Sequence, residues 1–183
     1  MMSEQSYVDK TLIVAAGTSH GGLTTIAYGA RDAVSGPGVC GLINFSGGLR
    51  QAECESWQKN LVGDYGQNVR LPSLGLYGDN DSVWQGDLAS RMYTAFTSHG
   101  ARANMVDFGD YKNDAHRLVG DRDGVQVWWP HVKAFLTQIG MPTAVQYQVS
   151  EPSLPKATDF ASLDSVKRCL SSMKTAAKGI ATF

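Results

Sequence analysis

Four short apolar segments recur along the first three quarters of the chain, and a segment with helical spacing follows each of them. The apolar segments span 11–16, 39–45, 71–77 and 103–108, and the helical ones span 20–34, 52–62, 85–99 and 125–139. The apolar segments carry nonpolar residues on both faces, as strands do when helices cover both sides of a parallel sheet. We therefore predict an α/β fold, with a mostly parallel sheet and helices on both of its faces.

The chain length of 183 residues suits one domain with a sizeable buried core. We assign residues 1–141 to this core and residues 142–183 to a linker and a tail, in which 163–178 has weaker helical periodicity. Pro130 would either open or kink the last helix of the core.

Composition excludes several classes of protein. The 16 Lys and Arg residues against 17 Asp and Glu give a net charge of −1, so the broad basic surface of a nucleic-acid binder is absent. No apolar run approaches the ~20 residues that cross a bilayer. Cys40, Cys54 and Cys169 form no CxxC pair, which excludes a zinc ribbon and leaves a Cys40–Cys54 disulfide open. The N-terminus has no signal-peptide pattern, so the sequence as written predicts a cytoplasmic protein, although a longer precursor could be secreted.

The loop after the first apolar segment contains a serine flanked by glycines, in the run Gly17-Thr18-Ser19-His20-Gly21-Gly22. It fits G-x-S-x-G, the pattern of a nucleophile elbow, in which a sharp strand-to-helix turn presents the serine hydroxyl. The backbone N–H of His20 would then donate to an oxyanion. The alternative is a glycine-rich turn that binds phosphate or nothing, although the lysine of a P-loop is missing.

The loop after the third apolar segment can supply a carboxylate that orients an imidazolium ion. We favour Asp81, with Asp79 as the alternative, and an Asp-rich turn without catalytic role remains open. The loop after the fourth apolar segment carries His116, which can take a serine proton and return it to a leaving group. Residues that follow parallel strands gather at one edge of a sheet, so we expect Ser19, Asp81 and His116 to meet there.

On these residues the sequence resembles the catalytic half of an α/β-hydrolase and is similar to the dienelactone-hydrolase-like serine esterases. The resemblance covers roughly residues 7–140. It rests on four motifs, which are 17–22 (GTSHGG), 44–48 (NFSGG), 76–81 (LYGDND) and 114–116 (DAH). It implies Ser19 as the nucleophile, Asp81 as the acid and His116 as the base. Dienelactone hydrolases proper use a cysteine nucleophile, so lactone specificity is not implied here.

These observations predict a serine hydrolase that cleaves an ester or related small acyl substrate through an acyl-enzyme, without a metal or organic cofactor. His20 is the expected oxyanion donor, and Gly47 and Gly48 are candidate substrate-binding residues. The alternatives are a prolyl-oligopeptidase-type peptidase and a non-catalytic module that binds a partner.

The family fold places several strands before the elbow strand, whereas about ten residues precede it here. We therefore expect a fragment or a reduced member of the family, whose activity is impaired because a second oxyanion donor is missing. The strand at 11–16 would then lie at an open edge of the sheet, where a second copy or a partner chain could pair with it.

Overall fold

The computed structural model describes residues 8–31, 38–48, 55–84 and 86–144, and of residues 55–58 it describes the backbone alone. The chain divides into two units, Met1–Ala144 and Val145–Phe183, and all described residues belong to the first. Strands and helices alternate along it, followed by two short 3₁₀ segments and a last helix. The elements are β1 (Ile13–Thr18), α1 (His20–Gly29), β2 (Val39–Phe45), α2 (Glu55–Asn68), β3 (Ser73–Tyr77), α3 (Leu88–Ser98), β4 (Ala103–Asp107), η3 (Ala115–Gly120), η4 (Arg122–Gly124) and α4 (Val125–Gln138).

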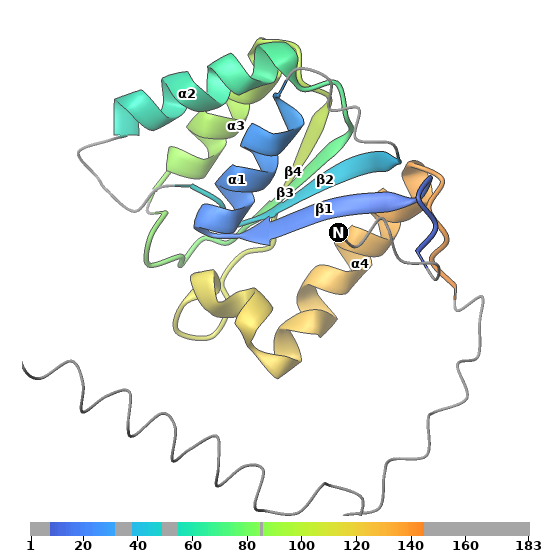
Figure 1. Cartoon of the computed structure of the whole chain (residues 1–183). Coiled ribbons are helices and arrows are strands. Elements are labelled where there is room, and N and C mark those ends of the chain that lie inside the picture. Colours follow the sequence, from blue (N-terminus) through green and yellow to red (C-terminus); the bar gives the residue numbers. More distant parts are fainter. Residues whose placement is uncertain (1–7, 32–37, 49–54, 85, 145–183) are drawn as a thin grey trace, which may run out of the picture. The chain divides into compact units, whose positions relative to one another are not determined.

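The four strands form one parallel sheet in the order β1-β2-β3-β4, as Figure 1 shows. The predicted parallel sheet is confirmed, and β1 lies at an edge of the described sheet. The prediction that β1 ends before Gly17 is wrong, because Gly17 and Thr18 still pair with Asn44 and Phe45 of β2. The parallel ladder thus carries the chain directly to Ser19.

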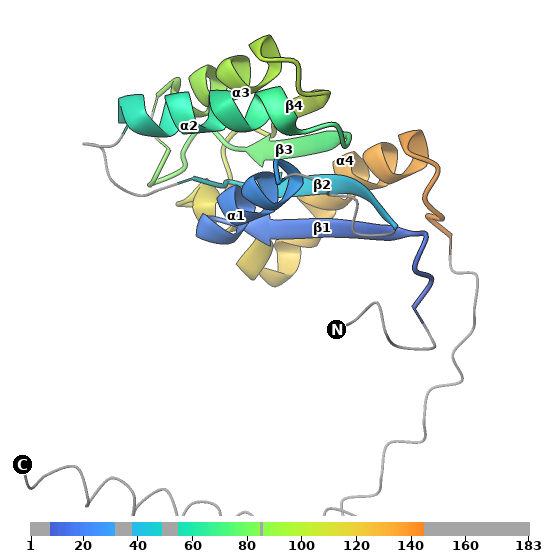
Figure 2. The same cartoon turned by 45° about the horizontal axis from the view of Figure 1, so that its top comes forward.

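Helices cover both faces of the sheet, as predicted. α1, α2 and α3 lie on one face and α4 lies on the other (Figures 1 and 2). Alternate strand residues point to the two layers, so one core cluster lies on each face of the sheet. The first cluster includes Leu23, Ile26, Leu42, Val62, Tyr77, Met92 and Phe96. The second includes Ile43, Phe45, Leu74, Leu76, Val132 and Phe135.

The helix boundaries differ from the predicted ones at several ends. α1 ends at Gly29 instead of reaching 34, and α2 continues to Asn68 instead of stopping at 62. The extension of α2 contains Gly63 and Gly66, where a Cβ would press against His99 and the Phe96 backbone of the α3 region. Close packing on α3 therefore compensates for the low helix propensity of glycine. Pro130 lies inside α4, so it does not open that helix.

Two further features bear on the composition arguments. Cys40 has a free thiol, which donates to the Thr11 carbonyl at 3.1 Å, and Cys54 lies outside the described residues. Within the described ranges, none of the helices combines the length and the apolar character that a membrane span requires. The expected tail helix at 163–178 also lies outside the described residues.

Candidate active site

Ser19 occupies a sharp turn between β1 and α1. Its backbone has φ 53° and ψ −126°, a strained conformation for a residue other than glycine. The Ser19 N–H donates to the Phe45 carbonyl at 2.9 Å, and the Ser19 carbonyl accepts from Gly22 at 2.9 Å and from Gly48 at 3.2 Å. Backbone hydrogen bonds from three directions therefore hold the serine in the geometry of a nucleophile elbow.

Two of the three glycines around Ser19, Gly17 and Gly22, are required by the close approach of neighbouring backbone. A Cβ at Gly17 would collide with the Gly21 carbonyl of α1, and a Cβ at Gly22 would lie 2.8 Å from the Gly47 Cα. These glycines let α1 start directly against β1 and against the loop that follows β2. The first glycine of the G-x-S-x-G pattern thus has a steric cause in this fold, whereas a Cβ at Gly21 would meet nothing within 4 Å.

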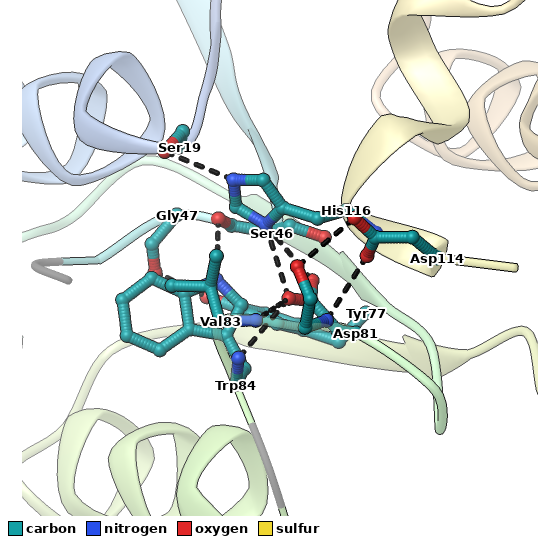
Figure 3. Close-up of polar contacts among 10 residues, drawn as sticks. Ser19, Ser46, Gly47, Tyr77, Asp81, Val83, Trp84, Asp114 and His116 are labelled. Atoms are coloured by element: carbon teal, nitrogen blue, oxygen red, sulfur yellow. Dashed lines mark hydrogen bonds and ion pairs between the residues drawn. The ribbon is translucent and has the colours of Figure 1, made fainter. Parts of the chain in front are cut away.

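His116 joins the serine to a carboxylate (Figure 3). Its Nε2 lies 3.1 Å from the Ser19 Oγ, and its Nδ1 lies 3.1 and 3.0 Å from the two carboxylate oxygens of Asp81. An ionised carboxylate can only accept, so Nδ1 carries the ring proton and Nε2 is left to accept the serine hydroxyl proton. The structure thus brings the three predicted residues together with the tautomer that a general base requires.

The Asp81 carboxylate is fully buried, with a side-chain exposure of 0%, whereas the side chain of His116 is 19% exposed. Besides His116, the Asp81 Oδ1 accepts hydrogen bonds from the backbone N–H groups of Val83 at 2.8 Å and Trp84 at 3.0 Å. These bonds satisfy a charge that would otherwise be costly to bury. The alternative acid Asp79 is exposed, and a hydrogen bond and like charge from Asp107 raise its pKa.

A second aspartate ties the acid turn to the histidine loop. The Asp114 Oδ1 accepts from the backbone N–H groups of Ser82 and His116, both at 3.0 Å, and its Oδ2 accepts from the Ser82 hydroxyl at 2.9 Å. Partial burial raises the pKa of Asp114, but these hydrogen bonds outweigh it and leave the pKa lowered. The sequence analysis named Asp114 only within a motif. It did not predict that Asp114 links the turn that carries Asp81 to the loop that carries His116.

The loop Ser46–Gly48, which follows β2, contacts the serine turn through the hydrogen bond from the Gly48 N–H to the Ser19 carbonyl. Ser46 has φ 45°, and its N–H donates to the Leu76 carbonyl at 2.8 Å. The Tyr77 hydroxyl donates to the Gly47 carbonyl at 2.9 Å and accepts from the Asn44 amide at 2.9 Å. Burial raises the pKa of Tyr77, so the phenol stays protonated as the donor.

The candidate substrate-binding and oxyanion residues differ in their exposure to solvent. Gly47 and Gly48 are buried, and the Gly48 N–H is engaged by the Ser19 carbonyl, so their contact with a substrate stays a prediction. His20 is the first residue of α1 and is exposed. The described residues contain no cluster of His, Cys, Asp and Glu suited to a metal ion.

The sequence analysis named Asn44 and Tyr77 only within motifs, without a role for either, and it did not name Trp84. Both Tyr77 and Trp84 are buried aromatic residues. The signal that could have found them is Asn44, an amide near the end of an otherwise apolar strand, because a buried amide needs polar partners.

Comparison with known proteins gives matches in structure alone. No family model matches the chain, and no curated protein matches it in sequence. A protein assigned as a dienelactone hydrolase from Klebsiella pneumoniae matches with a TM-score of 0.57 and 21% identity, over 75% of this chain and 56% of that one. An esterase from Pyrococcus furiosus matches with a TM-score of 0.55 and 12% identity, over 75% and 57%. The acylaminoacyl peptidase of Pyrococcus horikoshii matches with a TM-score of 0.53 and 15% identity, over 78% and 26%.

The shares covered show that this chain spans little more than half the length of the first two proteins. At these identities the likeness concerns the fold, and it agrees with the family resemblance that the sequence motifs indicated. The described residues therefore form an α/β fold with a four-stranded parallel sheet that matches part of the α/β-hydrolase fold.

Proposed function

We propose that the protein is a serine hydrolase that cleaves an ester or related acyl substrate through an acyl-enzyme on Ser19. The observation that carries the proposal is the continuous chain of hydrogen bonds from the Ser19 Oγ through His116 to the buried Asp81. The strained serine backbone supports it, because such strain persists where the surrounding structure imposes it and is often found at functional sites.

The proposed reaction begins when the Ser19 Oγ attacks the acyl carbon and its proton passes to the His116 Nε2. The Asp81 carboxylate stabilises the resulting imidazolium and keeps the ring oriented. The tetrahedral intermediate then collapses, the bond to the leaving group breaks, and His116 returns the proton to that group. Water attacks the acyl-enzyme in the same way, with His116 again as the base, and releases the acid and free Ser19.

The oxyanion would lie at the N-terminal end of α1. Gly22 and Leu23 donate their N–H groups to the Ser19 carbonyl, and the first N–H groups of a helix have no partner inside it. The His20 N–H is therefore the proposed donor to the oxyanion. Loss of one such donor costs about 10²–10³ in turnover, so a single donor would give a slow enzyme.

The same three residues would also serve cleavage of a peptide amide, and one structural neighbour is an acylaminoacyl peptidase. Ester and amide substrates of matched acyl group separate these candidates. Turnover of p-nitrophenyl esters without turnover of the corresponding p-nitroanilides supports the esterase, and comparable turnover of both supports the peptidase.

The role of Ser19 is tested with Ser19→Ala, and Ser90→Ala on the exposed surface of α3 serves as the matched control. We expect Ser19→Ala to lower turnover by about 10⁴–10⁶ and Ser90→Ala to leave it unchanged. Turnover that survives Ser19→Ala would remove the serine from the nucleophile role.

A further inference from the structure

Trp84 is buried between the two parts of the site that carry the acid and the nucleophile. It follows Asp81 by three residues, and only 3% of its surface is exposed. It belongs to the turn after β3, whereas Ser19 belongs to the turn after β1. In Figure 3 its indole ring lies beside the loop after β2 and below His116.

Both ends of Trp84 are fixed by hydrogen bonds within the site. Its backbone N–H donates to the Asp81 Oδ1 at 3.0 Å, and its indole Nε1–H donates to the Ser46 carbonyl at 2.8 Å. Ser46 begins the loop whose Gly48 N–H donates to the Ser19 carbonyl at 3.2 Å. Trp84 is therefore a second connection between Asp81 and Ser19, independent of His116.

The indole also fills the space that separates these groups. A Cβ at Gly48 would lie 2.7 Å from the Cζ2 of Trp84, so the loop after β2 packs directly on the ring. On another side, the centroid of the indole lies 6.4 Å from that of the His116 ring, at an interplanar angle of 55°. The buried ring thus lies against the loop that holds the Ser19 backbone and beside the His116 ring.

We propose that Trp84 is a positioning residue that sets the separation between Ser19 and Asp81, across which His116 must reach. This inference rests on the proposed hydrolase function. The imidazole has fixed dimensions, so it can bond both partners only when the acid turn and the serine turn stand at the right separation. The indole N–H fixes that separation, because it ties the acid turn to the Ser46 carbonyl on the loop that holds the serine backbone.

The experiment compares the rates at which a fluorophosphonate modifies Ser19 in the wild type, Trp84→Phe and two controls. Trp84→Phe keeps an aromatic ring but removes the indole N–H. Phe96→Leu removes packing from the core cluster to which Trp84 belongs but removes no hydrogen-bonding group, and Trp129→Phe replaces a tryptophan that is 39% exposed on α4.

We expect Trp84→Phe to lower the maximal modification rate by about ten- to a hundred-fold, the size of effect that a small misplacement of reacting groups produces. The concentration for half-maximal rate should stay unchanged, because the indole is buried. Phe96→Leu and Trp129→Phe should react at the rate of the wild type.

If Trp84→Phe does not fold, benzothienylalanine at position 84 keeps the bicyclic shape, has sulfur in place of the N–H, and should give the same loss. A Trp84 variant that reacts as fast as Phe96→Leu would overturn the positioning role and leave the hydrolase proposal intact. A folded wild type that does not react would overturn the hydrolase proposal, and the positioning role with it.

Discussion

Tyr77→Phe tests the support of the serine loop by removing a single oxygen atom. The Tyr77 hydroxyl stands between the Asn44 amide and the Gly47 carbonyl, and both contacts measure 2.9 Å and are buried. The Asn44 Oδ1 already has no hydrogen-bond partner in the described structure. The variant would therefore leave a whole buried amide group and the Gly47 carbonyl without partners.

The expected loss of stability follows from these two groups. Each buried polar group that loses its partner costs about 1–3 kcal/mol, and removal of the hydroxyl itself relieves part of that cost. We expect Tyr77→Phe to lower the free energy of unfolding by about 2–4 kcal/mol, with a fall in melting temperature of roughly 5–15 °C.

Urea unfolding followed by circular dichroism measures this loss, provided that the slope with denaturant concentration stays constant. Tyr28→Phe on the exposed side of α1 is the matched control and should unfold like the wild type. In an Asn44→Ala background, Tyr77→Phe should cost less, because one of the two orphaned groups is already gone. A Tyr77→Phe variant within about 0.5 kcal/mol of the wild type would refute the reasoning.

Two further predictions concern the carboxylates. Asp81→Asn keeps an acceptor for Val83 and Trp84 but presents an amide N–H to His116, so the imidazole should take the tautomer that cannot accept the serine proton. We expect the rate of modification by the fluorophosphonate to fall by about 10³–10⁴. An unchanged rate would contradict the proposed tautomer. Asp114 has a lowered pKa in the folded state. The ionised Asp114 carboxylate therefore stabilises the fold above its unfolded pKa near 3.8, and this stabilisation is lost as the pH falls through its pKa in the folded state. The difference in unfolding free energy between wild type and Asp114→Asn should therefore be constant above pH 5 and shrink below pH 4, whereas a pH-independent difference would show that the charge of Asp114 contributes nothing.

The sequence was sufficient to predict the sheet and the meeting of Ser19, Asp81 and His116. The reason is topological: in a parallel sheet every strand ends at the same edge, so residues that follow successive strands are brought together whatever the loops contain. The apolar runs were long enough to identify all four strands, and the errors concerned their ends.

Features that depend on packing between distant elements could not be predicted in this way. α2 extends through Gly63 and Gly66 because α3 lies close against it, and nothing local to that segment favours a helix. The supports of the site, Tyr77 and Trp84, are aromatic residues whose polar atoms matter only because Gly47 and Ser46 present carbonyls to them. Neither carbonyl can be recognised in a sequence, because every residue carries one.

The described sheet has β1 at one edge, as predicted. Among the described strands β1 pairs with β2 alone, so the expectation that a second copy or another chain adds to this edge stays a prediction.

The central claim is that Ser19 is an activated nucleophile, and intact-mass measurement after incubation with a fluorophosphonate tests it most directly. Such reagents modify a serine whose hydroxyl is activated by a neighbouring base, which an exposed serine alone does not provide. The account predicts one adduct on the wild type, located at Ser19 by peptide mapping, and no adduct on Ser19→Ala. A folded wild-type protein without an adduct, or an adduct that persists on Ser19→Ala, would contradict it.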